Sequence, residues 1–548
     1  MEKNVRKFHN LISILDKKVE KQAMPNQKWA SFVALTKTGK ISDQPMIHAA
    51  NALMAFGFEK KACDMLVLGC EILVKSGALL EKMVQTLRQF DREREAVQFL
   101  KKRIKADPQD WAATRLLGRV YYHQEDIVQY QGLIDSFLES NPDHLDGLVE
   151  KASYQGVKGQ SDIQATLVKI LDIQPDHLFG LSQMVQHYAI SYEFDQAGDY
   201  LKKLKEHHAD HALYSYCQGM LCDQKLDYEQ ALVHYNEALA RNPEMIEAYG
   251  KSGGMMVKLG RDLEEAWYRL EARFPQLLNR PDGPFWRGED LEGKKILIWA
   301  EQGIGDQLSF VSMLRDLPAG IKQVDIECEA KLVSLYQRSF PDFNVYPRRK
   351  NRKTTYDYHM PIGALARYLR PDLDSFTKTD AVPLVVDVDQ AQNWQSWLDG
   401  LGDGKKVGLA WRSGTSSMVR SRDAAHLIDD LGDLLKLENV QFINLFYADA
   451  SEELAEVQEK LGVTIHTPPE LDQFDDIDGT AALIKNLDLM VGVACAPVRL
   501  AQSVGVETVL TYTGDAGAVD PLWWPWTTYI NRHGDENWDI TPILDKLR

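Results

Sequence analysis

Residues 294–310 read KKILIWAEQGIGDQLSF, and this stretch decides the architecture of the chain around it. The apolar run Lys295–Ala300 is typical of a buried β-strand. Gly303 and Gly305 then remove side chains where the strand turns into a helix, so that backbone N–H groups and the helix start face a ligand. The stretch therefore predicts a strand, a tight loop and a helix. It is not the dinucleotide-binding fingerprint, because the third glycine is absent.

Upstream of this stretch the chain is repetitive. Four prolines close successive units: Pro108, Pro142, Pro175 and Pro243. The last interval is twice as long as the others, and Ala209 stands halfway across it in the place of a proline. A period of about 34 residues is that of tetratricopeptide repeats, which stack pairs of helices. The sequence predicts an all-helical solenoid over 43–277 and a less regular helical cap over 1–42. Further helical stretches are expected around 48–57, 61–74 and 82–105.

The clearest repeat unit runs from Ala212 to Met245. Gly219 and Ala231 are small residues where two helices must approach closely, and Tyr235 is expected to fill the space beside them. Solenoids of this kind present a concave groove that holds an extended peptide or a partner helix. The repeats therefore predict a protein partner.

The composition is that of a globular protein with more than two domains: 548 residues, 44% hydrophobic and 26% charged. No run approaches the roughly 20 apolar residues of a membrane span, and the first residues lack a secretory signal pattern, so a cytoplasmic protein without a membrane span is expected. The net charge of −17 argues against a nucleic-acid partner, because phosphate contacts need a basic face. The basic run 348–353 is interpreted as a solvated loop, with an anionic-ligand contact as the alternative.

No metal site is predicted. The six cysteines are scattered without the spacing of a zinc site, and reduced, mostly buried thiols are expected. Three carboxylates cluster in the run 475–478, and metal binding is the alternative reading of this cluster. Asp478 with Thr480 is more simply expected to cap a helix over 481–485.

Downstream of the loop 278–293, which is rich in Pro and Gly and is interpreted as a linker and hinge, strands alternate with helices. This alternation predicts an open α/β organisation with parallel sheets. Apolar, β-rich runs mark the expected strands: 295–300, 324–327, 407–411, 442–446, 487–493 and 508–511.

The strand and helix units fall into two sets that divide near 382–401. They predict two Rossmann-like lobes facing a cleft, over 294–390 and 391–548. Trp523–Trp526 is interpreted as partly core and partly the crossover that leads a C-terminal helix, 540–548, back onto the first lobe.

Several separate motifs follow one another in order: WRG at 286–288, GKKILI at 293–298, EQGIGD at 301–306, WRSG at 411–414, FDDIDGTAAL at 474–483 and LDLMV at 487–491. In this order they resemble the bacterial tetratricopeptide-repeat glycosyltransferases. The catalytic part of that family is a GT-B fold related to the heptosyltransferases and, more distantly, to the O-GlcNAc transferases. The resemblance covers nearly all of 284–548. WRSG, the segment FINLFYADASEEL and the ending DPLWWPW are similar to the branch associated with glycosylation of flagellin and other surface proteins.

The resemblance implies a first lobe that receives the acceptor. Asp306 lies where a helix begins, so it either caps that helix or acts as the general base that takes the acceptor proton. In related heptosyltransferases an Asp at this motif is the proposed base. His359 lies near the start of another expected helix and is carried as an acceptor-site candidate beside a structural role.

The resemblance also implies a second lobe that holds the nucleotide-sugar. Its candidate ligand residues lie after two expected strands: Trp411, Arg412, Ser413 and Gly414, and then Cys495, Ala496, Pro497 and Arg499. The ends of parallel strands are where ligands of open α/β sheets bind, and a helix that begins with Pro497 would offer its N-terminus to a phosphate. Many relatives carry Asp-Thr where this chain has Ala494 and Cys495, with a His shortly after, where this chain has Arg499. This departure suits a donor such as a CMP-activated acidic sugar, or it marks a lobe that has lost catalysis.

The sequence therefore predicts a metal-independent GT-B glycosyltransferase, with no cofactor besides its nucleotide-sugar substrate, that glycosylates Ser or Thr of a protein held by its repeats. Flagellin is the favoured acceptor. The alternatives are a non-catalytic adaptor with a degenerate GT-B domain and a glycosyltransferase directed at a saccharide.

Overall fold

The computed structural model describes residues 42–55, 57–124, 126–158, 163–272, 281, 283–300, 303–348, 355–378, 382–413, 427, 429–514, 516–532 and 539–547, together with residue 34. The chain forms two compact units. The first comprises 1–157 and 165–175, and the second comprises 158–164 and 176–548. The predicted cap over 1–42 falls outside the described residues except at 34 and 42.

The first unit consists of helix pairs. The first helices of successive pairs begin at 43, 77, 111 and 145. This constant spacing confirms the tetratricopeptide-like period of about 34 residues and extends it upstream of the prolines. The helices are α3 (Asp43–Ala55), α4 (Glu59–Ile72), α5 (Gly77–Gln89), α6 (Glu93–Ala106), α7 (Trp111–His123), α8 (Ile127–Ser140), α9 (Leu145–Lys158) and α10 (Ile163–Ile173).

Local chemistry sets where these helices begin and end. The side chains of Ser76, Asp110 and Asp126 accept hydrogen bonds from the free N–H groups at the starts of α5, α7 and α8. The stretch 82–105, predicted as one helical region, is two helices. Asp91 separates them by adopting a left-handed backbone with φ of 56°, which a helix interior does not allow.

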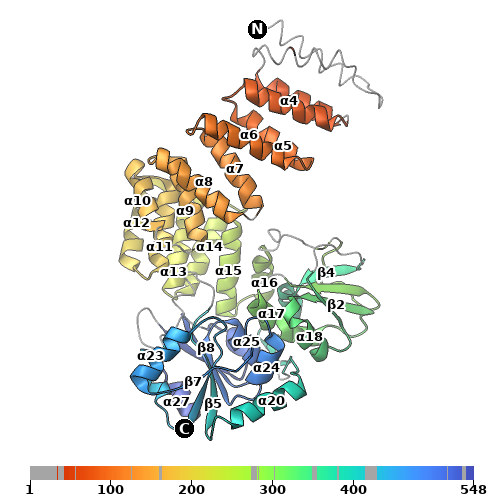
Figure 1. The fold of residues 1–548 in the computed structure, drawn as a ribbon, viewed down its shortest axis with the longest axis vertical. Helices are drawn as coiled ribbons and strands as arrows, with labels where there is room; N and C mark the ends of the chain where they lie inside the picture. The colour runs from red at the N-terminus through yellow and green to blue at the C-terminus, as the bar shows by residue number, and fades with distance from the viewer. Residues whose placement is uncertain are drawn as a thin grey trace. The chain divides into compact units, whose positions relative to one another are not determined.

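The second unit begins with three more helix pairs, whose first helices start at 178, 212 and 246 and so keep the same period. Figure 1 shows them side by side. They are α11 (Leu178–Ile190), α12 (Phe194–His208), α13 (Ala212–Gln224), α14 (Tyr228–Arg241), α15 (Ile246–Leu259) and α16 (Leu263–Leu270).

The pair α13 and α14 packs as its sequence predicts. Ala231 and Tyr235 are 0% exposed. A Cβ built on Gly219 would lie 2.7 Å from the Tyr235 ring, well inside the roughly 3.5–4.0 Å of a carbon contact. Only glycine therefore allows the ring to reach the α13 backbone without a shift.

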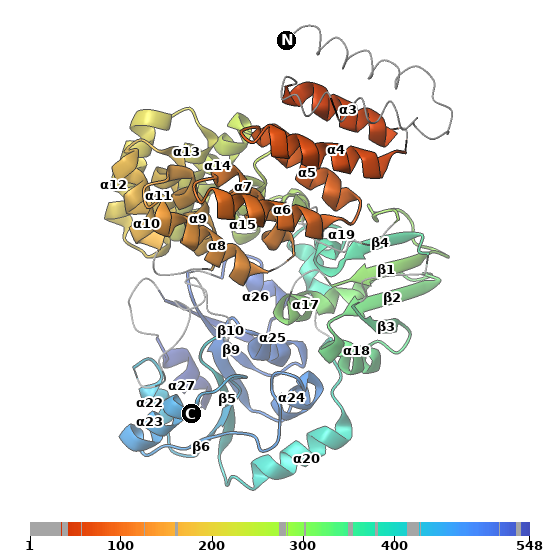
Figure 2. The ribbon, with the colours of Figure 1, turned by 45° about the horizontal axis from the view of Figure 1, so that its top comes forward.

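The first lobe that follows has a four-stranded parallel sheet in the order β3-β2-β1-β4. Figure 2 shows the four strands side by side in this order. Ile298 in β1 is in register with Ile326 in β2 and with Met360 in β4. The strands are β1 (Lys295–Trp299), β2 (Gln323–Cys328), β3 (Asn344–Pro347) and β4 (Tyr358–Pro361). The helices are α17 (Ile304–Phe310), η2 (Val311–Asp316), η3 (Ala330–Leu332), α18 (Val333–Ser339), η4 (Ile362–Leu365), α19 (Ala366–Leu369) and η5 (Asp374–Lys378).

The second lobe has a six-stranded parallel sheet in the order β10-β9-β8-β5-β6-β7. One face packs against α24 and α25, and the other against α22, α23 and α27 (Figure 2). The strands are β5 (Lys405–Ala410), β6 (Val440–Asn444), β7 (Ile465–His466), β8 (Leu489–Val493), β9 (Thr508–Thr513) and β10 (Thr527–Arg532). The helices are α20 (Val388–Asp399), α22 (Gly432–Leu435), α23 (Ser451–Leu461), α24 (Ile477–Ile484), α25 (Ala496–Ser503), α26 (Asp520–Trp523) and α27 (Thr541–Leu547).

The last repeat helix is built into the core of the lobes. The Trp267 indole in α16 donates a hydrogen bond to the Arg370 carbonyl at 2.7 Å. Its ring packs edge-on against Trp523, with centroids 6.1 Å apart. Trp523 in turn contacts Phe310 and Phe376 of the first lobe. One apolar cluster therefore joins α16 and both lobes.

Two predictions about connecting segments are corrected. The predicted linker 278–293 is in part built into the first lobe, because Trp286 is 4% exposed and its backbone N–H bonds to the His359 carbonyl at 3.0 Å. The C-terminal helix does not return to the first lobe. In α27, Ile543 packs into the apolar core of the second lobe, and Lys546 pairs with Glu507 of the same lobe.

All six cysteines lie in described residues, and none forms a disulfide. Five are buried and Cys222 is half-buried. None of the helices in the described part of the chain combines the length and the apolar character that crossing a membrane requires.

Candidate functional site

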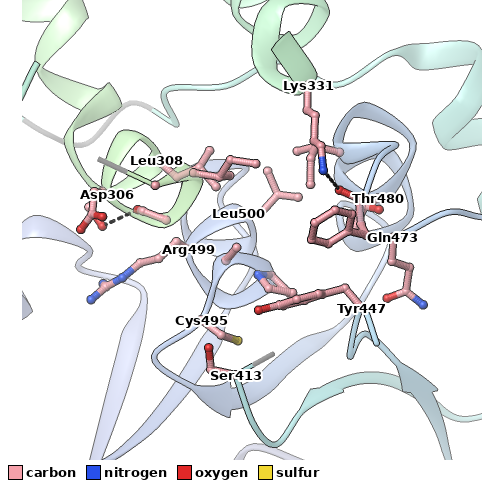
Figure 3. A pocket seen from close by; sticks show the side chains of 18 of the residues that line it. Asp306, Leu308, Lys331, Ser413, Tyr447, Gln473, Thr480, Cys495, Arg499 and Leu500 are labelled. Atoms are coloured by element: carbon pink, nitrogen blue, oxygen red, sulfur yellow. Dashed lines mark hydrogen bonds between the residues drawn. The ribbon is translucent and has the colours of Figure 1, made fainter. Parts of the chain in front are cut away.

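A pocket of about 520 Å³ lies between the two lobes of the second unit (Figure 3). Its walls come from the segments that follow β1, β2, β5, β6, β7 and β8, beyond the carboxyl ends of these strands. Ligands of open α/β sheets bind at this end. The polar side chains of the lining are Asp306, Ser309, Lys331, Ser413, Tyr447, Gln473, Thr480, Cys495 and Arg499.

The first-lobe wall is the start of α17. Gly303 is the residue before the helix and Asp306 lies in its first turn, so Asp306 does not occupy the capping position that one prediction gave it. A Cβ built on Gly305 would meet no atom within 4 Å, which means that this glycine leaves space open beside the helix. Asp306, Gly303 and Gly305 all line the pocket, and Asp306 is half-buried there.

The second-lobe wall is the start of α25. Cys495 precedes the helix and makes no side-chain cap, and Pro497 is in the first turn. Figure 3 shows the Cys495 thiol and the Ser413 hydroxyl near each other, with Arg499 on the side of the pocket toward Asp306. The Arg499 guanidinium bonds to Gln502 at 3.0 Å and keeps further N–H donors. A helix N-terminus beside a guanidinium is a favourable place for an anion.

Trp411 and Arg412 do not line the pocket. Both are tied to Glu453 of α23. The Trp411 indole donates to the Glu453 carboxylate at 3.1 Å, and the Arg412 Nη2 donates to it at 2.7 Å. Arg412 also stacks 3.9 Å from the ring centroid of Phe446. These two residues hold the strand end from which Ser413 reaches the pocket. Gly414 lies outside the described residues.

His359 is not brought to the pocket, which corrects its prediction as an acceptor-site residue. It lies within β4 and is 1% exposed. Its Nδ1 accepts a hydrogen bond from the Trp299 indole at 3.2 Å, and its Nε2 is 3.2 Å from the Gly283 carbonyl. Its backbone bonds to Pro284 and to Trp286. His359 therefore fastens the segment before β1 to the first sheet.

Sequence reasoning missed three pocket residues that meet across the lobes. Tyr447 follows β6, and its ring centroid is 6.0 Å from that of Phe474, which is 56% exposed. Lys331 from the first lobe lies 3.5 Å from the Phe474 centroid. Tyr447 and Phe474 both stand in segments that the resemblance singled out, but only the fold shows that they face one pocket.

The acidic run before α24 has structural partners. The cap of α24 is Asp476, whose side chain accepts from the Gly479 N–H at 2.8 Å, so the predicted cap by Asp478 is corrected. Asp478 instead pairs with Arg338 of the first lobe at 2.7 Å. Among the described residues, no group of three or more His, Cys, Asp or Glu side chains is arranged to hold a metal ion.

One group near Arg499, the Tyr529 phenol, has a shifted pKa. Burial and then the charge of Asp520 raise the pKa of Tyr529, and nearby Arg499 opposes the shift. Tyr529 also donates its hydroxyl to the Asp520 carbonyl at 2.8 Å. The phenol therefore remains a neutral donor, and no anionic phenolate competes with a ligand for Arg499.

The fold and the site define a two-lobed α/β protein that carries tetratricopeptide-like repeats and, between its lobes, a pocket lined by both polar and apolar residues. No protein-family profile matches the chain. Protein FlbA of Caulobacter vibrioides is 34% identical over 299 residues, which are 50% of this chain and 49% of FlbA. The chain thus spans about half the length of this curated relative.

Two solved structures show weaker likeness. A glycosyl transferase family 9 structure from Veillonella parvula covers 47% of this chain and 92% of its own, with 14% identity and a TM-score of 0.34. A tetratricopeptide repeat protein from Parabacteroides merdae covers 46% and 98%, with 12% identity and a TM-score of 0.30. Scores this low identify no fold, so the fold rests on the elements of the chain itself.

Proposed function

We propose that this protein is a GT-B glycosyltransferase that moves a sugar from a nucleotide-activated donor to a Ser or Thr hydroxyl of a protein held by its repeats. The observation that carries the proposal is the pocket that joins Asp306 of one lobe to Arg499 and the start of α25 of the other. Such a reaction needs an anion site for the leaving nucleotide and a base for the acceptor proton. In this proposal the start of α25 with Arg499 is the anion site, and Asp306 is the base.

In this proposal the donor lies against the second lobe. Its phosphate meets the first-turn N–H groups of α25 and the planar guanidinium of Arg499, which suits phosphate oxygens because it donates two parallel hydrogen bonds. Tyr447 and Phe474 offer aromatic faces to the nucleobase of the donor. Arg499 stands where many relatives carry a His, and its permanent charge favours a donor with an additional carboxylate, such as a CMP-activated acidic sugar.

The acceptor hydroxyl then attacks the anomeric carbon of the donor. The new bond joins the acceptor oxygen to that carbon, the bond from the carbon to the phosphate oxygen breaks, and its electron pair leaves with the nucleotide. Asp306 takes the hydroxyl proton. A positioned base of this kind contributes about 100- to 10,000-fold to the rate.

The repeats supply the acceptor in this proposal. Tetratricopeptide-like helix pairs bind peptides or partner helices in a groove. A small saccharide would not need so long a surface, which favours a protein acceptor. Flagellin is the acceptor that we propose, because the WRSG and DPLWWPW segments resemble the branch associated with its glycosylation.

Isothermal titration calorimetry tests the donor site. The ligands are CMP, UDP, GDP, ADP and their sugar conjugates, titrated into wild type, Arg499→Ala and the control Arg261→Ala. Arg261 pairs with Glu229 at 3.1 Å on the exposed surface of the repeats. We expect selective binding of one nucleotide class, weakened about 10- to 100-fold by Arg499→Ala and unchanged in the control.

Intact-mass spectrometry of flagellin incubated with the selected donor then tests transfer. We expect the mass of one or more sugars to be added by wild type, and far more slowly by Asp306→Asn. Equal transfer by wild type and Asp306→Asn would remove Asp306 from the mechanism.

A second function is favoured by one observation. Ala494 and Cys495 line the pocket where many relatives carry Asp and Thr, so this chain lacks a carboxylate and a hydroxyl there. Such a loss is expected in a non-catalytic adaptor. If none of the nucleotides binds, the glycosyltransferase proposal fails and the repeats alone carry the function.

A further inference from the structure

Besides the apolar cluster that both lobes share, polar side chains of one short first-lobe segment, 330–339, link the lobes beside the pocket. This segment comprises η3 and α18. Lys331 Nζ donates to the Phe474 carbonyl at 2.8 Å and pairs with the Asp475 carboxylate at 2.6 Å. Two turns later, the Arg338 guanidinium makes a two-pronged contact with the Asp478 carboxylate, at 2.8 and 2.7 Å. Both contacts fall on the second-lobe segment 474–478.

The Arg338 contact is the more restrictive of the two. The Arg338 side chain is 27% exposed and that of Asp478 is 13% exposed, whereas Asp475 is 66% exposed. Two parallel hydrogen bonds between a planar guanidinium and a carboxylate fix both distance and orientation, which a single lysine contact does not. Shielding from water also weakens the screening of this pair by salt.

Arg338 also holds the chain that connects the lobes. Its Nη1 is 3.3 Å from the Val385 carbonyl, and its Nη2 is 3.6 Å from the Asp387 carboxylate. The neighbouring Ser339 hydroxyl accepts from the Val385 N–H at 2.9 Å. One guanidinium of the first lobe thus contacts both the connection and the second lobe.

The second-lobe end of this contact lies beside the pocket. Phe474, Ile477 and Thr480 flank Asp478 and all line the pocket, while Asp306 lines it from the first lobe. The separation of the lobes therefore sets the distance between Asp306 and a donor on the second lobe. A misplacement of about 1 Å is enough to slow an enzymatic reaction about 100-fold.

We propose that Arg338 is a positioning residue: its contact with Asp478 holds the lobes at the separation that brings Asp306 to the donor. The inference rests on the proposed glycosyl transfer. It assigns Arg338 no contact with donor or acceptor, since Arg338 does not line the pocket. Donor binding, which uses the second lobe, and transfer, which needs both lobes, are therefore affected differently.

The test uses the full-length protein as wild type, Arg338→Gln, Asp478→Asn and the charge-exchanged double variant Arg338→Asp with Asp478→Arg. Arg348→Gln is the matched control, because Arg348 pairs with Glu329 at 3.6 Å within the first lobe. Nucleotide Kd is measured by calorimetry and kcat by transfer to the protein acceptor. The separation of the lobes is measured by pulsed electron spin resonance between encoded labels at exposed Lys322 and Lys460.

We expect Arg338→Gln and Asp478→Asn to lower kcat about 100-fold, to change the nucleotide Kd less than threefold, and to broaden the distance distribution. The double variant is expected to narrow the distribution again and to recover part of kcat. The control is expected to match wild type in all three measurements.

Three outcomes would overturn the inference while leaving the proposed function intact: a kcat of Arg338→Gln equal to that of wild type, an unchanged distance distribution despite lost transfer, or a double variant no better than the single ones. If wild type itself binds no nucleotide or transfers no sugar, the proposed function fails, and the positioning role falls with it. The wild-type measurements thus distinguish the two failures.

Discussion

Replacing Gly219 by alanine tests the packing of the repeats most sharply. The new methyl group would lie 2.7 Å from a Tyr235 ring that is 0% exposed, about 1 Å closer than a carbon contact allows. The ring is enclosed by the core of α13–α15, so relief requires the helices to move apart. Overpacking of this kind costs about 1–3 kcal/mol. Alanine is intrinsically better than glycine in a helix by about 1 kcal/mol, which leaves a net loss of up to about 2 kcal/mol.

Gly254→Ala is the matched control. Gly254 is also a helix-interior glycine, in α15, but a Cβ there would meet no atom within 4 Å. This variant should therefore show only the gain of about 1 kcal/mol. The difference between the two variants isolates the packing cost of about 1–3 kcal/mol, because the helix preference for alanine is common to both.

Native-state hydrogen exchange measured by mass spectrometry provides the assay, since it reports the stability of each helix in a chain of several domains. Amides of α13 and α14 should exchange up to about 30-fold faster in Gly219→Ala, and amides of α15 about fivefold slower in Gly254→Ala. If Gly219→Ala slows exchange as much as the control does, the close approach of Tyr235 to the α13 backbone is refuted.

Three further predictions concern the repeats. Asp91→Gly should stabilise the first unit by up to about 1 kcal/mol, because Asp91 is exposed and adopts a left-handed backbone that glycine accepts without steric strain. Thermal unfolding followed by circular dichroism checks this. Burial lowers the pKa of His187 below its ordinary value near 6.5. The unfolded chain therefore binds the proton more readily than the folded chain, and the free energy of unfolding falls as the pH is lowered through about 6.5. His187→Gln should therefore lose less stability than wild type between pH 7 and pH 5 in urea unfolding. Burial raises the pKa of Cys70, Cys217 and Cys222, to about 12 for the first two, which are the more deeply buried. Alkylation at pH 8 followed by peptide mass analysis should therefore modify half-buried Cys222 before Cys70 and Cys217, and equal rates would contradict this.

The expected strands and the missed strands differ in their place in the sheets. Each of the six apolar runs named from the sequence overlaps a strand of the structure, and these six strands include every central strand. The missed strands are β3, β4, β7 and β10, and each is an edge of its sheet. An edge strand has one neighbour and shorter apolar runs, so its sequence carries less of the pattern that marks a buried strand.

The candidate site divides along similar lines. Asp306, Ser413 and the loop around Cys495 follow predicted strands directly, so local sequence places them at the carboxyl ends of the sheets. Lys331 meets Phe474 across 143 positions of sequence, and no local pattern records that contact. The error with His359 has the same cause: a histidine near the start of an expected helix looks the same in sequence whether its partner is a ligand or the Trp299 indole.

The place of Trp267 has a practical consequence for dividing the protein. A fragment starting at residue 278 would keep both lobes and their pocket but would lack the whole of α16. Trp523, 7% exposed in the full chain, would lose the indole that covers it, and the Arg370 carbonyl would lose its donor. Such a fragment is expected to aggregate or to unfold at a lower temperature. A fragment that starts before α15 keeps α16, and with it the Trp267 indole that covers Trp523. The domain boundary that the repeat period predicts, near residue 278, is therefore not a position at which the chain can be divided without loss of stability.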